Sequence, residues 1–192
     1  MKLLIAPLVM IASQMLYAQD LPYREIPEAP ASYTATHVAA RLIDGLGLRY
    51  YWATENLREE DLAYRPSPEA RTCMETLTHI HAMSAMIANA SAKQPTTLAA
   101  APKLSFADLR KQTLQNFKLA SDNLKASNDS DMEEMDLIMK RGESQSEFPF
   151  WNLINGPISD CLWHVGQVVS FRRASGNPLS DKISVLTGKV RE

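Results

Sequence analysis

Apolar side chains recur every three to four residues along most of the chain. This period runs through four stretches, at about 36–57, 73–89, 105–126 and 149–174, and it gathers the apolar positions on one face of a helix. Four amphipathic helices of such lengths hide their apolar faces best by packing against one another. The pattern therefore predicts an all-α fold, an up-down four-helix bundle.

Signals for the ends of these helices support the assignment. Thr72 followed by Glu75 has the spacing of a capping box, which predicts the start of the second helix. Pro157 lies inside the fourth stretch and is expected to kink or restart that helix, because proline lacks the N–H of the helical ladder. The segment at 127–148 is polar and acidic, with an apolar island at 135–139 that is equally typical of a short strand and of a helical turn.

The two ends of the chain differ from the middle. Residues 1–18 show an early positive charge, an apolar run and a small residue at the end, Ala18, the pattern of a cleaved secretory signal peptide. An uncleaved membrane anchor is the alternative. Residues 19–35 contain three prolines and predict an extended arm, 36–178 form the bundle, and 179–192 form a C-terminal tail. We therefore expect an exported protein, periplasmic or extracellular.

Composition excludes several classes of function. The formal net charge is -2 and the chain has no block rich in lysine and arginine, so nothing predicts binding to nucleic acid. The chain has no second apolar run long enough to predict an integral membrane span. The two cysteines, Cys73 and Cys161, are too few for a disulfide framework, but they allow one disulfide, two free thiols or thiol chemistry. The acidic residues of 127–148 lack a glycine-centred calcium loop and indicate a solvated charge run.

One polar triplet stands out in the apolar sequence NGPISDCLWHVGQVVSFRR. Asp160, His164 and Gln167 follow one another at spacings of four and three residues, which places them on one face of a helix. A carboxylate that faces the interior needs a partner, because burying it alone costs several kcal/mol. Arg172 and Arg173 point away from this face and predict surface or interface contacts.

The second predicted helix offers a partner for this triplet. His79 and His81 both lie in it, but they are about 200° apart around the axis, so only one can face the bundle interior. His79 shares its face with Glu75 and Met83, which indicates the core side. His79 is therefore the candidate.

The two segments together resemble a known family. THIHAM in the second helix and SDCLWHVGQVVSFRR in the fourth are similar to the DinB/YfiT-like superfamily of four-helix bundles, over about 37–178. In that family one histidine of the second helix and two of an H-x-x-x-H segment in the fourth bind a divalent metal. His79 and His164 match two of these positions, and Asp160 stands where the family has its intervening histidine. The resemblance implies a site for zinc, nickel, iron or manganese with open positions.

The same resemblance suggests supporting residues and chemistry. Gln167, Glu75 and Asn155 are the candidates around the ligands. Gln167 is expected to orient a ligand or to bind backbone, and for Asn155 bonding to the local backbone is the favoured role. Characterised relatives include metal-dependent thiol transferases and isomerases, which implies a small-molecule substrate or thiol as partner, and the family tends to form homodimers. The leading hypothesis is an exported DinB-like divalent-metal-binding protein, a hydrolase or a thiol or group transferase with metal-activated water or thiol.

A non-catalytic reading competes with this hypothesis. In it the chain is an exported helical-bundle binding or interaction module without metal. His164 then donates a hydrogen bond to Asp160 or to another acceptor, and His79 is a core histidine with its hydrogen bonds satisfied.

Overall fold

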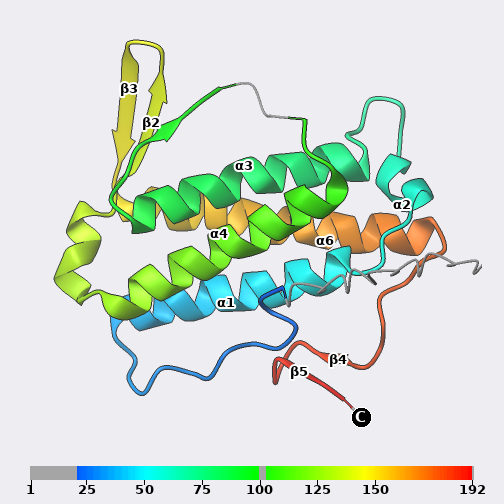
Figure 1. The fold of residues 1–192 in the computed structure, drawn as a ribbon, viewed down its shortest axis with the longest axis horizontal. Helices are drawn as coiled ribbons and strands as arrows, with labels where there is room; N and C mark the ends of the chain where they lie inside the picture. The colour runs from blue at the N-terminus through cyan, green and yellow to red at the C-terminus, as the bar shows by residue number, and fades with distance from the viewer. Residues whose placement is uncertain (1–20, 100–102, 192) are drawn as a thin grey trace, which may run out of the picture.

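Four long helices pack into a bundle in the computed structural model, which describes residues 21–99 and 103–191 (Figure 1). They are α1 (Ala35–Thr54), α3 (Cys73–Ser91), α4 (Phe106–Ala126) and α6 (Ser159–Ala174). The prediction of several packed amphipathic helices is confirmed. The predicted signal peptide lies outside the described residues.

Local side-chain chemistry explains where three of these helices begin. Thr34 and Ser105 accept hydrogen bonds from backbone N–H groups in the first turns of α1 and α4. Thr72 and Glu75 form the predicted capping box of α3, in which the Glu75 carboxylate accepts from the Thr72 N–H at 2.7 Å. Each contact satisfies a donor that the first turn of a helix leaves without a partner.

The core lies along the axis of the bundle and draws on all four long helices. The ring of Tyr50 on α1 meets the ring of Phe117 on α4 edge to face, with 5.9 Å between the centroids. Other fully buried side chains are Ile43, Leu46, Leu77, Ile80, Leu114 and Leu124. Burial of such side chains supplies about 1.5–3 kcal/mol each, so the bundle provides a rigid frame for polar groups at its surface.

The order of helix directions differs from the predicted one. Three side-chain hydrogen bonds join α3 to α4 with a constant separation of 32 residues: His81 with Thr113, Asn116 with Ser84, and Asn123 with Ser91. A constant separation means that α3 and α4 run in the same direction, whereas α1 and α6 run opposite to them (Figure 1). The bundle is up-down-down-up, and the predicted up-down order is wrong.

The chain between α3 and α4 explains this order. An extended chain advances about 3.3 Å per residue and a helix only about 1.5 Å. The segment from Ser91 to Phe106 is therefore long enough to return along the 19 residues of α3 and start α4 at the same end. The sequence pattern showed a loop there, but it did not show where the loop goes.

Small sheets also depart from a purely all-α fold. β1 (Thr96–Thr97) pairs in parallel with β2 (Leu137–Arg141), and β2 forms an antiparallel hairpin with β3 (Ser144–Phe148). The apolar island at 135–139 is thus largely strand, an alternative that periodicity alone leaves open in a short run. Near the C-terminus, β4 (Ile183–Ser184) pairs with β5 (Lys189–Val190).

The predicted fourth helix consists of three pieces. α5 (Phe150–Leu153) leads into a π-helical turn, η2 (Ile154–Ile158), and α6 follows. Pro157 lies inside the π turn, as expected of a residue that cannot donate to the α-helical ladder. Asp160 consequently stands in the first turn of α6.

Two short helices complete the connections. α2 (Glu59–Ala63) lies between α1 and α3, and a 3-10 helix, η1 (Asp129–Glu134), follows α4. In the parts of the chain that the structure covers, no helix is long and apolar enough to cross a membrane.

The prediction that Arg172 makes surface or interface contacts is wrong. Its side chain is buried and donates to the carbonyl oxygens of Trp52 and Ala53, at 2.9 and 3.2 Å, and to that of Asn177 at 2.7 Å. The end of α1 exposes carbonyl groups that have no helical partner, and a guanidinium satisfies several of them at once. Arg172 therefore ties α6 to α1.

The N-terminal arm and the C-terminal tail lie along the bundle and bond to each other. Tyr23 donates to the buried carboxylate of Asp44 at 3.1 Å, and its ring occupies the space beside Gly47 that a side chain would need. The N–H of Ile26 donates to the carbonyl of Gly188 at 2.9 Å. The two terminal segments thus form one unit on the side of α1.

Candidate metal site

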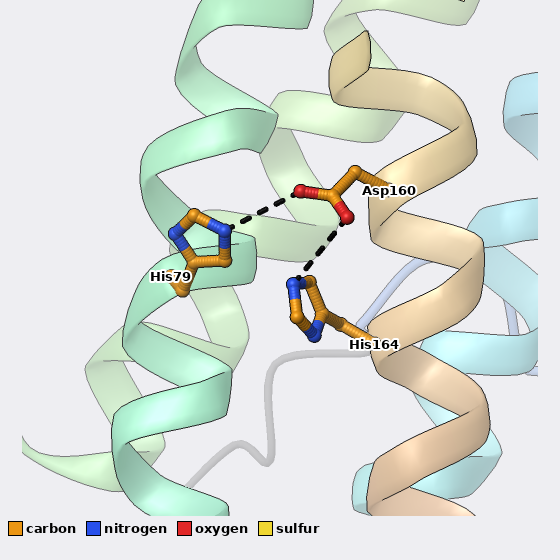
Figure 2. Close-up of side chains that lie close together, drawn as sticks. All are labelled: His79, Asp160 and His164. Carbon is orange, nitrogen blue, oxygen red and sulfur yellow. Dashed lines mark ion pairs between the residues drawn. The ribbon is translucent and has the colours of Figure 1, made fainter. Parts of the chain in front are cut away.

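Antiparallel packing of α3 against α6 brings the three predicted ligands together (Figure 2). His79 projects from α3, and Asp160 and His164 project from successive turns of α6. Nε2 of His79 lies 3.4 Å from one carboxylate oxygen of Asp160, and Nε2 of His164 lies 3.5 Å from the other. The imidazole rings meet edge to face, with 4.9 Å between their centroids.

These separations suit a metal ion. One nitrogen or oxygen atom from each residue can be chosen so that all three lie within 4.8 Å of one another. Two atoms bound at about 2.0–2.1 Å to a tetrahedral zinc ion are about 3.3–3.4 Å apart. Each histidine lies at about this distance from a different oxygen of Asp160, so a shared ion requires these side chains to rotate. The donor set of two imidazoles and one carboxylate therefore fits a divalent metal and leaves coordination positions free.

The cluster lies in the bundle surface and is not sealed in the core. The side chains of His79 and Asp160 are 35% and 41% exposed, whereas that of His164 is 13% exposed. A structural zinc site is closed, and a catalytic site keeps a position for water or substrate. Solvent can therefore reach the candidate ligands.

Gln167 fixes the orientation of His164. Its side-chain Oε1 lies 2.7 Å from Nδ1 of His164, one turn further along α6. When Nδ1 carries the proton and donates to this oxygen, Nε2 presents its lone pair toward Asp160. Gln167 thus occupies the place that its helical spacing predicted for an orienting residue.

The environment of His79 favours its neutral form. Partial burial lowers the pKa of His79 below its ordinary value of 6.5, and the positive charges of Arg71 and His164 lower it further, against an opposing effect of Asp160. A neutral imidazole is the form that binds metal. His79 is therefore prepared to act as a ligand near neutral pH.

The other predicted supporting residues lie elsewhere. The carboxylate of Glu75 bonds Thr72 and lies 3.8 Å from Arg65. Asn155 is exposed on the π turn. Neither forms a hydrogen bond to the three candidate ligands, so the capping role of Glu75 is the one that the structure shows.

His81 and the two cysteines lie outside the cluster. Nδ1 of His81 contacts the hydroxyl of Thr113 on α4 at 3.2 Å, on another side of α3. Cys73 and Cys161 are buried and both are free thiols, and burial raises the pKa of Cys73 to about 12. Neither thiol resembles a reactive nucleophile, which is exposed and has a lowered pKa.

Two grooves reach the cluster from different directions, and the sequence pattern predicted neither. The first, which we call the apolar groove, has a volume of about 360 Å³ and includes His79 and Asp160 in its wall. The rest of its lining is mainly apolar: Met83, Met86, Leu137, Met139, Phe148 and Pro157. Its outer wall is the β2–β3 hairpin, whose position the sequence could not provide.

The second, which we call the arginine groove, has a volume of about 300 Å³ and includes His164 and Gln167. Arg71, Thr76 and Phe171 line it as well. One signal for Arg71 was available in the sequence. Arg71 directly precedes Thr72, the N-cap of the helix that carries His79. It therefore lies near the N-terminal end of α3.

Comparison with known proteins adds no assignment. Searches against protein-family models, curated proteins and solved structures found no significant match to this chain. The functional assignment therefore rests on the geometry of the cluster.

Proposed function

We propose that this chain is an exported DinB-like protein that binds one divalent metal ion through His79, Asp160 and His164. The observation that carries the proposal is the convergence of two imidazole nitrogens and a carboxylate from two helices, with one potential ligand atom of each residue within 4.8 Å of the others. Sequence similarity to the DinB/YfiT-like motifs supports the same residues. Zinc, nickel, iron and manganese all accept this donor set.

The proposed activity is that of a metal-dependent hydrolase or a thiol or group transferase. A divalent ion held by three protein groups lowers the pKa of a bound water or thiol and makes it a nucleophile near neutral pH. Residues of the chain do the remaining work. Gln167 holds His164 in one tautomer and orientation, and the exposed side of the cluster admits a small-molecule substrate through the two grooves.

Elemental analysis and calorimetric titration test the metal site. Purified protein is stripped with a chelator and titrated separately with zinc, nickel, iron(II) and manganese, the iron titration under anaerobic conditions. We expect one ion per chain for at least one of these metals, and loss of that binding in His79→Ala and His164→Ala. The control is His81→Ala, which removes a histidine from the same helix but away from the cluster. A wild-type protein that takes up none of the four metals would contradict the proposal and support the metal-free binding module.

Export is tested separately. Expression of the whole sequence in a bacterium with a secretory pathway is followed by cell fractionation and mass spectrometry of the N-terminus. The proposal expects the product outside the cytoplasm with Gln19 as its first residue, because cleavage is predicted after Ala18. A cytoplasmic product that retains residues 1–18 contradicts export without affecting the metal site.

A further inference from the structure

The two grooves meet at the candidate ligands. His79 and Asp160 belong to the wall of the apolar groove, and His164 belongs to the wall of the arginine groove. Since all three residues place ligating atoms within 4.8 Å of one another, both grooves adjoin the same cluster. A small molecule that lies across the cluster therefore reaches into both.

The apolar groove suits a flexible hydrocarbon group. Apart from His79 and Asp160, its lining includes no charged side chain. Three of its residues are methionines, whose unbranched and polarisable side chains adapt to apolar groups of different shapes. Phe148 at the hairpin is 38% exposed, so part of this apolar surface stays in contact with water until a ligand covers it.

The arginine groove suits an anion. Arg71 is exposed and takes part in none of the ion pairs found among residues 21–99 and 103–191. A guanidinium recognises a carboxylate through two parallel hydrogen bonds. Arg71 lies near the carboxylate of Glu75 without forming an ion pair with it, and it lines the arginine groove, which does not include the apolar side chains of the other groove.

We infer that the site accepts N-acyl amino acids, that is, small molecules with an apolar acyl chain, a central amide carbonyl and a carboxylate. The acyl chain lies in the apolar groove, the carboxylate pairs with Arg71, and the carbonyl lies at the cluster between them. The placement of the carbonyl rests on the proposed metal function, whereas the recognition of the two ends rests on the grooves alone.

Three matched probes separate the two ends of the ligand. N-octanoylglycine has both, N-octanoylglycinamide lacks the negative charge, and N-acetylglycine lacks the long chain. Each is titrated calorimetrically into the purified protein, once loaded with its preferred metal and once metal-free. We expect N-octanoylglycine to bind at least tenfold more tightly than either of the others in both forms, because each groove contributes without the metal.

Variants assign each preference to its groove. Arg71→Gln should remove the tenfold preference for N-octanoylglycine over its amide and leave the chain-length preference unchanged. Phe148→Ser, at an exposed hairpin position, should reduce the chain-length preference and leave the charge preference unchanged. Arg173→Gln and Trp151→Ser are the controls, since both remove exposed side chains of the same types outside the two grooves.

The outcomes distinguish this inference from the proposed function. A protein that binds no metal but keeps both ligand preferences contradicts the metal site and retains the ligand class. A protein that binds metal but shows no binding of N-octanoylglycine, or shows preferences that Arg71→Gln and Phe148→Ser do not change, overturns the ligand class alone.

Discussion

Asp61 and Asp160 are carboxylates in contact with neighbouring helices, yet their surroundings differ throughout. Asp61 is fully buried and accepts hydrogen bonds from Arg58, Ser175 and Asn177 at 2.5–3.1 Å. Asp160 is 41% exposed, and its oxygens lie 3.4 and 3.5 Å from the Nε2 atoms of two histidines. The hydrogen-bonding capacity of Asp61 is filled by short hydrogen bonds, whereas Asp160 can still accept further ligands or hydrogen bonds.

This difference separates a structural role from a functional one. A buried carboxylate is tolerated only when its hydrogen-bonding capacity is filled, and once filled it can bind nothing else. Asp61 meets this condition and joins α2 to the end of α6. Asp160 holds two imidazoles at a distance at which a metal fits between donor atoms. Identical substitutions at the two positions should therefore affect different properties.

The largest expected effect is on metal affinity in Asp160→Asn. An amide is a weaker ligand than a carboxylate and carries no charge, so the affinity should fall by more than about 100-fold, beyond the 10–100-fold typical of residues around the ligands. Stability of the metal-free protein should change by less than about 0.5 kcal/mol, as is usual for an exposed position. Competition with a chelating dye measures the first quantity and urea unfolding the second. An unchanged metal affinity would remove Asp160 from the site.

Asp61→Asn should show the reverse pattern. The new amide N–H₂ would face donors that now converge on the carboxylate, and the loss should be about 2 kcal/mol in the free energy of unfolding. Metal affinity of the folded variant should stay within about twofold, because Asp61 does not contact the cluster. Urea unfolding monitored by circular dichroism measures the loss. A variant as stable as the wild type would show that these hydrogen bonds do not hold α2 to the end of α6.

A smaller effect is expected from Gln167→Ala. Without the side-chain oxygen, His164 loses the contact that selects its tautomer, and metal affinity should fall by about tenfold. Gln167→Glu retains an acceptor at the same place and should recover most of the affinity. Both affinities are measured by competition with the same chelating dye. Equal affinities in wild type and Gln167→Ala would assign Gln167 to the surface.

The smallest expected effect is the pH dependence of the stability that Asp61 contributes. Hydrogen bonds, above all from Arg58, lower the pKa of Asp61 below its ordinary value of 3.8. A lowered pKa in the folded state means that the stabilisation is complete above about pH 5 and is lost as the pH falls through and below 3.8. The stability difference between wild type and Asp61→Asn should therefore be smaller at pH 3 than at pH 7. A difference that grows on acidification would contradict this sign.

The sequence predicted the candidate ligands better than the path of the chain. His79, Asp160 and His164 could be found because helical spacing determines which residues share a face, and a face needs no knowledge of the loops. The up-down-down-up order could not be found, since a loop of that length permits both directions. The burial of Arg172 was not predicted for a related reason. Its partners include backbone carbonyls of α1, and every residue has a backbone carbonyl, so the sequence does not mark these partners.

The grooves were hidden by the same limitation. Met83 was correctly placed on the face of His79, but the apolar groove exists only because the β2–β3 hairpin stands beside α3 and α5. Strand pairing between distant segments depends on register and on the route of the connection, which periodicity does not report. Arg71 likewise becomes relevant only because it lines a groove together with His164 and Gln167 of α6.

The π turn at Ile154–Ile158 sets the rotational phase of the site. A residue added to or removed from a helix turns everything beyond it by about 100°. The wide turn absorbs such an extra residue, so that Phe150 and Leu153 can stay in the core while Asp160 and His164 face α3. If one residue were deleted from this turn, α5 and α6 would rotate relative to each other by about 100°. The α5 side chains could then stay buried, or Asp160 could face His79, but not both.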